Sequence, residues 1–196
     1  MTTEHQALNE GQMLFAFPDT AGLKGPCEAE RSVPSTTHLA STGSPECESH
    51  DCRELASEAV QMALATKPIE HQDNWDIQVL GAPLTCGAEP TEVRQALRNL
   101  VLNALDMQPN GGQVIIHIQQ EDNSIVFSVE DSGPGVAPDV AHRVFEPFFT
   151  TRAEGTGLGL ALVRSIAELH GGHLQLDPNP SPLGGACFHF SLSATG

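Results

Sequence analysis

The chain has 196 residues and a formal net charge of −16, because 25 Asp and Glu side chains outnumber 9 Lys and Arg. Such an acidic protein lacks the basic surface of a general nucleic-acid binder, so we expect no nucleic-acid partner. No apolar run approaches the roughly 20 residues of a membrane-spanning helix. The first ten residues also lack the basic and apolar parts of a signal peptide, which predicts a cytoplasmic location.

The five cysteines are odd in number and scattered, which favours reduced thiols. Cys47 and Cys52 flank His50, but this spacing is looser than that of paired zinc ligands. In residues 1–30 an apolar cluster ends at a proline, which predicts a short helical segment. Residues 31–50 are rich in Ser, Thr and Pro and are interpreted as a linker. We expect residues 51–196 to form the folded domain.

The first half of this domain contains two helical patterns and two short strand patterns. Asp51 can cap a helix whose apolar residues recur at helical spacing as far as Lys67. Residues 75–80 alternate like a strand, and residues 84–86 are a second candidate strand. The strongest helix pattern covers residues 89–107. Its apolar face consists of Ala96, Leu97, Leu100, Val101, Ala104 and Leu105.

The second half of the domain mixes strands and helices, with a hairpin between the first two strands. The predicted strands are 114–118, 125–129, 173–176 and 186–192. The predicted helices are a short one over 138–144 and a longer one over 158–169, with a loop over 146–156 between them. Strands interleaved with helices and joined by hairpins predict an α+β fold, a two-layer α/β sandwich.

A polar stripe follows the strong helix opposite its apolar face. Gln95, Asn99, Asn103 and Asp106 recur at intervals of three or four residues and therefore share one side of the helix. Asparagine is a poor helix former, and a carboxamide oxygen suits Mg2+. The alternative is an ordinary amphipathic helix with solvated asparagines.

Two glycine-bearing stretches could contact a nucleotide. Asp131 follows a strand and can accept a hydrogen bond from an exocyclic amino group such as adenine N6, with Gly133 and Gly135 allowing close approach. The alternative is an ordinary Asp-Ser-Gly turn. Residues 155–159, Gly-Thr-Gly-Leu-Gly, open a helix, and a helix N-terminus offers free N–H groups to phosphate. Arg152 lies just before them and could neutralise a terminal phosphate.

The order of these motifs resembles the ATP-binding domain of sensor histidine kinases. That family belongs to a wider ATPase group with gyrase, heat-shock chaperones and mismatch-repair proteins. Residues 99–104 look like its N box and residues 131–135 like its first glycine box. Residues 145–152 look like its F box and residues 155–160 like its second glycine box. The resemblance runs from about residue 51 to the C-terminus and is closest to the nitrogen-regulatory type of kinase.

The resemblance implies the Bergerat ATP-binding fold, a mixed and mostly antiparallel sheet covered by helices on one face, with ATP and Mg2+ as cofactors. It implies that Asn103 binds the metal, that Asp131 reads adenine and that Arg152 is a lid residue near the phosphates. The other implied nucleotide-binding residues are Asn99, Gly133, Gly135, Gly155, Thr156, Gly157, Leu158 and Gly159. Asp106 departs from many relatives, which place a phosphate-contacting lysine there.

Asn99 and the missing acceptor histidine decide which activity the resemblance implies. Hydrolysing relatives have a glutamate where this chain has Asn99, and an amide cannot act as a general base. We therefore expect phosphoryl transfer, with Asn99 and Arg152 as catalytic residues. Neither His5 nor His50 is followed by the family's acceptor pattern, and Asp51 suits a helix cap better.

Three readings follow from the resemblance. The chain is the catalytic part of a histidine kinase acting on a histidine supplied by another domain or chain, with a dimerisation domain, a response regulator and a second copy as possible partners. The alternative is a non-catalytic, kinase-like ATP-binding regulator that controls a partner protein. The third reading, an ATP hydrolase, is disfavoured by Asn99. The apolar cluster near residue 15 resembles the end of the second helix of the family's dimerisation hairpin.

Overall fold

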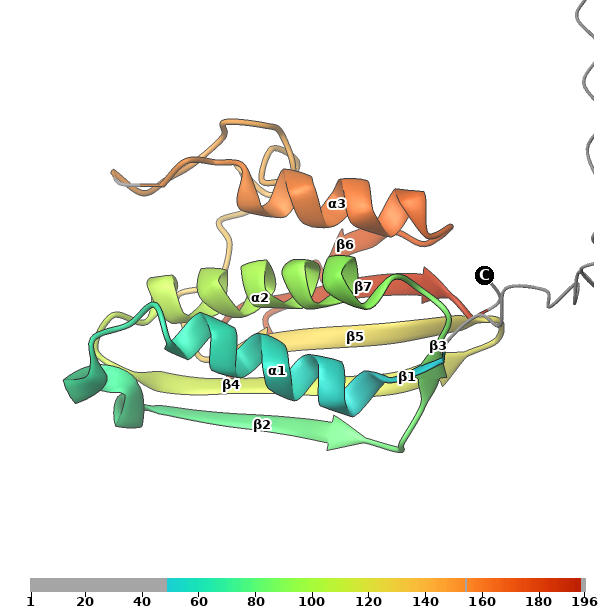
Figure 1. Cartoon of the computed structure of the whole chain (residues 1–196). Coiled ribbons are helices and arrows are strands. Elements are labelled where there is room, and N and C mark those ends of the chain that lie inside the picture. Colours follow the sequence, from blue (N-terminus) through green and yellow to red (C-terminus); the bar gives the residue numbers. More distant parts are fainter. Residues whose placement is uncertain (1–48, 154, 195–196) are drawn as a thin grey trace, which may run out of the picture. The chain divides into compact units, whose positions relative to one another are not determined.

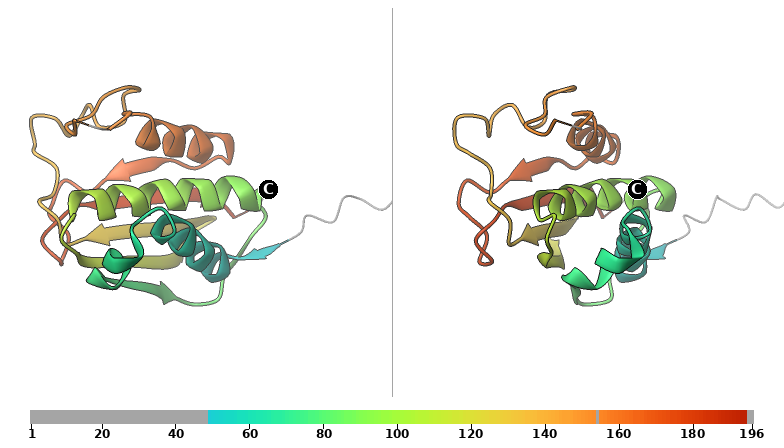
Figure 2. Two further views of the ribbon diagram at one scale, coloured as in Figure 1. Left: turned by 60° about the vertical axis from the view of Figure 1, so that its left-hand side comes forward. Right: turned by 90° about the vertical axis from the view of Figure 1, so that its left-hand side faces the viewer.

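The computed structural model describes residues 49–153 and 155–194. The helical segment expected in residues 1–30, and all but the end of the linker expected in residues 31–50, lie outside the described residues. In the described part, three α-helices lie on one face of a five-stranded sheet (Figure 1, Figure 2). This arrangement confirms the predicted α+β two-layer sandwich.

The three helices begin and end close to the residues that the sequence predicts. They are α1 (Cys52–Leu64), α2 (Pro90–Met107) and α3 (Gly159–Leu169). The Asp51 carboxylate caps α1 by accepting a 2.7 Å hydrogen bond from the backbone N–H of Arg53. The Glu89 carboxylate caps α2 in the same way, through the backbone N–H of Glu92 at 2.9 Å. A short 3-10 helix, η1 (Ile69–Asn74), leads from α1 to the sheet.

The main sheet has the strand order β2-β4-β5-β7-β6. Its members are β2 (Trp75–Gly81), β4 (Gly112–Glu121), β5 (Ser124–Asp131), β6 (Leu174–Leu176) and β7 (Cys187–Ser193). The β2–β4 pair is parallel because α2 connects these strands as a crossover, whereas the β4–β5, β5–β7 and β6–β7 pairs are antiparallel. The sheet is therefore mixed and mostly antiparallel, as expected.

One hydrophobic core fills the space between the sheet and the helices. The predicted apolar face of α2 is buried in it, together with Val93. Alternate residues of β5 and β7 enter the core from the sheet, and the rings of Phe127 and Phe190 stack with their centroids 5.8 Å apart. Both rings are fully buried, so they anchor the centre of the sheet against the helices.

The structure differs from the sequence prediction at residues 138–144, where no helix forms. The segment is a run of turns, with backbone hydrogen bonds from Val140 to Ala137, from Arg143 to Val140 and from Glu146 to Arg143. A seven-residue helix has too few internal hydrogen bonds to offset its nucleation cost. Val140 and Val144 instead line a cavity described below.

A second difference is a small ladder before the domain's first helix. Strand β1 (His50–Asp51) pairs antiparallel with β3 (Thr85–Cys86), which the sequence predicted as a strand without a partner. Two-residue strands carry no detectable periodicity, so β1 was not predicted. The ladder joins the start of the domain to the segment that precedes α2.

Three checks concern the described residues alone. Cys52, Cys86 and Cys187 are free thiols and are buried. Residues 49–153 and 155–194 contain no cluster of three His, Cys, Asp or Glu side chains able to hold a metal. Within the same ranges, every helix is too short or too polar to cross a bilayer.

Replacing Phe190 with Ala tests the placement of the core. We expect the free energy of unfolding to fall by about 3–5 kcal/mol, because the lost burial and the new cavity add together. Urea denaturation followed by circular dichroism measures this change. The matched control is Leu169→Ala, whose side chain is 69% exposed and whose loss should change the stability by less than about 0.5 kcal/mol. Equal losses in the two variants would contradict this core.

Candidate functional site

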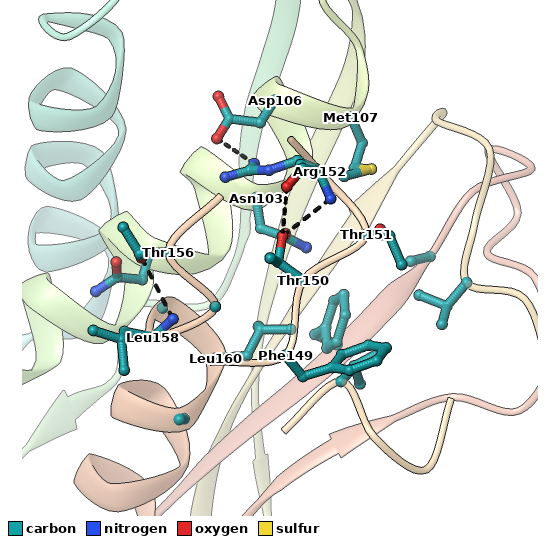
Figure 3. A pocket seen from close by; sticks show the side chains of 18 of the residues that line it. Asn103, Asp106, Met107, Phe149, Thr150, Thr151, Arg152, Thr156, Leu158 and Leu160 are labelled. Carbon is teal, nitrogen blue, oxygen red and sulfur yellow. Dashed lines mark hydrogen bonds and ion pairs between the residues drawn. The ribbon is translucent and has the colours of Figure 1, made fainter. Parts of the chain in front are cut away.

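A cavity of about 890 Å3 lies among α2, the segment 134–152 and the N-terminal end of α3 (Figure 3). Its walls are mostly apolar, with polar groups contributed by α2 and by residues 150–156. Eight of the predicted site residues line it: Asn99, Asn103, Gly135, Arg152, Thr156, Gly157, Leu158 and Gly159. The other three, Asp131, Gly133 and Gly155, do not line the cavity. The structure therefore gathers most of the predicted residues around one cavity.

The polar stripe of α2 forms one wall of the cavity. Asn99, Asn103 and Asp106 all line it, while the opposite face of the same helix is in the core. The Asn99 amide donates a 2.8 Å hydrogen bond to the backbone oxygen of Gln95. The Asn103 side chain forms no hydrogen bond within the part of the chain that the structure describes, and in Figure 3 it lies among the cavity-lining side chains. Its carboxamide oxygen is therefore available to a metal or ligand.

Asp131 lies directly behind the cavity wall, at the C-terminal end of β5, and is only 4% exposed. Its Oδ1 accepts hydrogen bonds from the backbone N–H of Gly133 at 2.8 Å and of Ala186 at 3.3 Å. Burial raises the pKa of the Asp131 carboxyl, although these two hydrogen bonds oppose the shift. Ala186, whose N–H donates to this carboxylate, also lines the cavity. A hydrogen-bond donor on a bound ligand would stabilise its charged form.

The loop before β7 holds Asp131 from a second side, and this role was not predicted. Ser181 is buried, and its hydroxyl donates a 2.8 Å hydrogen bond to the Asp131 backbone oxygen. The Gly185 N–H donates to the same oxygen at 3.1 Å. A Cβ on Gly185 would lie 2.2 Å from Asp131 Oδ1, so only glycine fits there. The adjacent glycines at 184 and 185 were the available sequence signal.

The segment between the two predicted glycine boxes folds back on itself. Phe148 donates a 2.9 Å backbone hydrogen bond to the Gly157 oxygen. A Cβ on Gly157, whose φ is +67°, would lie 2.3 Å from the Phe148 carbonyl carbon. Phe148 itself has a positive φ and a side chain that is 75% exposed. The contact therefore closes residues 148–157 into a loop over the cavity, with strain at Phe148.

The N-terminal end of α3 faces the same cavity. Leu158 precedes the helix without a side-chain cap, and its N–H contacts the Thr156 hydroxyl at 3.4 Å. A Cβ on Gly159 would meet Asn99 Oδ1 at 3.6 Å, so the polar stripe of α2 and the start of α3 are neighbours. Free backbone N–H groups and the helix dipole make such an end suitable for phosphate.

Arg152, predicted as a lid residue near the phosphates, lines the cavity. Its guanidinium forms an ion pair with Asp106 (Figure 3), and Asp106 also pairs with the Lys67 ammonium. Lys67, which lies just after α1, was not predicted to be near the site, and it does not line the cavity. Position 106, where many relatives of the resembling family place a lysine, therefore carries a carboxylate that is paired with two cations.

Residues 88–196 match the model of the family described as Histidine kinase-, DNA gyrase B-, and HSP90-like ATPase. The match covers more than half of the chain, and the chain belongs to this family. The domain is an ATP-binding domain of the type found in sensor histidine kinases, as the motif order indicated.

Curated relatives agree with this assignment. The sensor histidine kinase ZraS of Escherichia coli K12 is 44% identical over 89 residues, which cover 45% of this chain and 19% of ZraS. Sporulation kinase A of Bacillus subtilis is 37% identical over 104 residues, covering 53% of this chain and 17% of that kinase. The chain thus spans about a fifth of the length of the relatives that it matches.

Solved structures of catalytic domains share the fold. The mycobacterial sensor histidine kinase MprB aligns with a TM-score of 0.65 and 28% identity, covering 76% of this chain and 97% of that structure. The catalytic domain of histidine kinase ThkA also has a TM-score of 0.65, with 29% identity and coverages of 76% and 95%. Full-length ShkA in complex with AMPPNP gives a TM-score of 0.61 and 28% identity, covering 76% of this chain and 31% of ShkA.

Replacing Asp131 with Asn tests the burial of the carboxylate independently of any ligand. Because the pKa of Asp131 is raised above its ordinary 3.8, its ionisation destabilises the folded state at neutral pH. This penalty is lost as the pH falls through the folded-state pKa. We therefore expect the Asn variant to be more stable than the wild type at pH 7, with a difference that shrinks towards pH 4.

Denaturant unfolding at several pH values measures the difference. The exposed Asp139→Asn variant is the control and should show no comparable trend. An Asp131→Asn variant that is less stable than the wild type at pH 7 would contradict the role of burial.

Proposed function

We propose that this chain is the Mg2+-ATP-binding catalytic part of a sensor histidine kinase, which transfers the γ-phosphoryl group to a histidine supplied by another domain or chain. The observation that carries the proposal is the position of three groups around one cavity. The α2 stripe and the start of α3 line it, and Asp131 lies behind its wall. The solved structure of ShkA with AMPPNP supports nucleotide binding by a domain of this fold.

Different residues of the site would bind the adenine, the phosphates and the metal. Asp131 would accept a hydrogen bond from the adenine amino group, and Gly133 and Gly135 would let the chain pass close to the base. The start of α3, residues 155–159, would donate backbone hydrogen bonds to the phosphates. The carboxamide oxygen of Asn103 would hold Mg2+, which suits one or two protein oxygens with phosphate and water completing its shell. Bound Mg2+ would offset phosphate charge.

A histidine acceptor is compatible with an amide at position 99, because its attack needs no general base. A neutral imidazole nitrogen already has a lone pair, so it can attack the γ-phosphorus without a general base. The new N–P bond forms as the bond to the β–γ bridging oxygen breaks, and ADP carries away the electron pair. Water must lose a proton to become an equally good nucleophile, and an amide at position 99 cannot accept it. Asn99 therefore favours transfer over hydrolysis.

His50 does not match the family's acceptor pattern, although an acidic residue follows it. His50 lies in β1, and Asp51, the acidic residue after it, caps α1. We propose that the acceptor lies on a histidine-containing dimerisation domain, that a response regulator receives the phosphoryl group and that the reaction takes place in the cytoplasm. The alternative is a kinase-like ATP-binding regulator that controls a partner without transfer. We also propose that the kinase acts as a homodimer.

A transfer assay tests the proposed function. The chain is mixed with γ-labelled ATP and Mg2+, alone and with a separate dimerisation domain that carries an acceptor histidine. We expect acid-labile label on the added domain and none on the chain alone. Nucleotide binding without any transfer would support the regulator instead, and steady phosphate release without an acceptor would support hydrolysis. A dimerisation domain with its acceptor histidine replaced is the control.

Asn103→Ala tests the metal assignment. The change removes the carboxamide oxygen but leaves a good helix former, so the fold should persist. We expect the variant to lose the gain in ATP affinity that Mg2+ gives the wild type, as measured by isothermal titration calorimetry with Mg2+ and with EDTA. Asn179→Ala, in an exposed turn, is the matched control. A metal-dependent gain that survives in Asn103→Ala would show that another residue binds Mg2+.

A further inference from the structure

Asp106 lines the cavity and binds two cations that come from different parts of the chain. Lys67 follows α1, and Arg152 belongs to the loop over the cavity. All three side chains are partly buried, with exposures of 18% for Lys67, 28% for Asp106 and 34% for Arg152. One carboxylate at the C-terminal end of α2 therefore joins the segment after α1, the helix α2 and the loop.

The ion pair with Asp106 engages the group that the phosphates would need. Arg152 is the cation that lines the cavity in the described chain, and its guanidinium points to the carboxylate (Figure 3). A phosphate group competes for the same charge-assisted hydrogen bonds. We propose that Asp106 is a positioning residue, which holds Arg152 and its loop against α2 until a nucleoside polyphosphate draws Arg152 away. This inference rests on the proposed function for its ligand.

Lys67 makes the exchange feasible. A partly buried carboxylate left without a partner would destabilise the protein, because its lost hydration would not be replaced. Lys67 is the least exposed of the three residues, and its backbone oxygen accepts a 3.0 Å hydrogen bond from the Gln72 side chain. It therefore stays beside Asp106 when Arg152 leaves. The carboxylate keeps one counter-ion, and Arg152 is free to follow the phosphate.

The position of Arg152 is coupled to the backbone of the loop. The Thr150 hydroxyl accepts a hydrogen bond from the Arg152 N–H at 3.0 Å, and Gly155 donates to the Arg152 oxygen at 3.2 Å. A Cβ on Gly155 would meet the Thr150 hydroxyl at 2.3 Å, so this turn is tight. Movement of Arg152 must therefore disturb the amides of Arg152 and Gly155. Their hydrogen exchange reports the contact without any nucleotide.

The first experiment measures amide exchange in the free protein. Asp106→Asn removes the charge at nearly constant shape, and we expect the amides of Arg152 and Gly155 to exchange about two- to fivefold faster, the range of a partly exposed ion pair. Arg152→Gln should give a similar rise, and the double variant no more than either, because both remove one interaction.

Glu58→Gln is the matched control for this experiment. It breaks the 3.0 Å ion pair that joins α1 to α2 through Arg94, away from the cavity. It should leave the exchange of both amides unchanged. Unchanged exchange in Asp106→Asn, or additive effects in the double variant, would overturn the positioning role.

The second experiment measures binding of adenosine, ADP and ATP with Mg2+ by calorimetry. Asp106→Asn should bind ATP about two- to fivefold more tightly than the wild type, because the phosphates no longer compete with a carboxylate for Arg152. Adenosine has no phosphate, so its affinity should not change. Weaker ATP binding in Asp106→Asn would overturn the inference and make Asp106 a direct ligand of the metal or nucleotide.

The two experiments separate the inference from the proposed function. A wild-type chain that binds no ATP, with faster exchange in Asp106→Asn, refutes the proposed function and leaves the Asp106 contact in place. A wild-type chain that binds ATP, with no change in exchange or affinity on replacing Asp106, refutes the inference alone. Circular dichroism and thermal unfolding of each variant confirm that the fold is intact.

Discussion

The cavity wall beside Asp131 depends on one constraint, which is that the buried carboxylate of this residue must be hydrogen-bonded. A charge with 4% exposure needs hydrogen bonds to remain in the interior, and it receives them from two separate segments. One donor, Gly133, belongs to the turn after β5, and the other, Ala186, directly precedes β7. The strand pairing places these segments side by side, and the absence of a side chain at Gly185 lets them close around the oxygen. The cavity wall next to Asp131 is thus built where two interior strands of the sheet, β5 and β7, meet at their ends.

Helix α2 connects this wall to the rest of the fold. One face of the helix is buried between α1, the sheet and α3, and the other presents amides and a carboxylate to the cavity. Asparagine is a poor helix former, so Asn99 and Asn103 lower the intrinsic stability of α2. The burial of the opposite face of the helix compensates for this loss. A single helix therefore contributes one face to the core and the other to the cavity, so a shift of its buried face also moves the polar stripe.

The sequence predicted well what depends on periodicity and poorly what depends on pairing across the chain. The three helices and the hairpin of β4 and β5 follow from apolar spacing, because the solvent boundary imposes that spacing. Residues 138–144 had a helical composition but too short a length to form a helix. The two-residue ladder of β1 and β3 has no pattern that a sequence could reveal.

The same distinction applies to the candidate site. Eight of the residues predicted from the motif order line the cavity, because each lies on or next to an element that the sequence predicts. The pairing of Asp106 with Lys67 and Arg152 joins residues 39 and 46 positions apart, which no local pattern could indicate. The role of Gly185 depends on its close contact with Asp131, which lies at the end of β5, far away in the sequence. These features required the tertiary structure.

The place of β7 in the sheet has a consequence for how the domain assembles. It follows every other described element along the chain, yet it lies between β5 and β6 and is hydrogen-bonded on both sides. Ala186, just before β7, and Phe188, near its start, also line the cavity. β2, β4 and β5 can pair with one another before β7 is made, but β6 pairs with β7 alone and the second side of β5 is left open until β7 arrives. Such non-local pairing is slow to form. Nucleotide-binding competence is therefore acquired late, at the step that also completes the sheet.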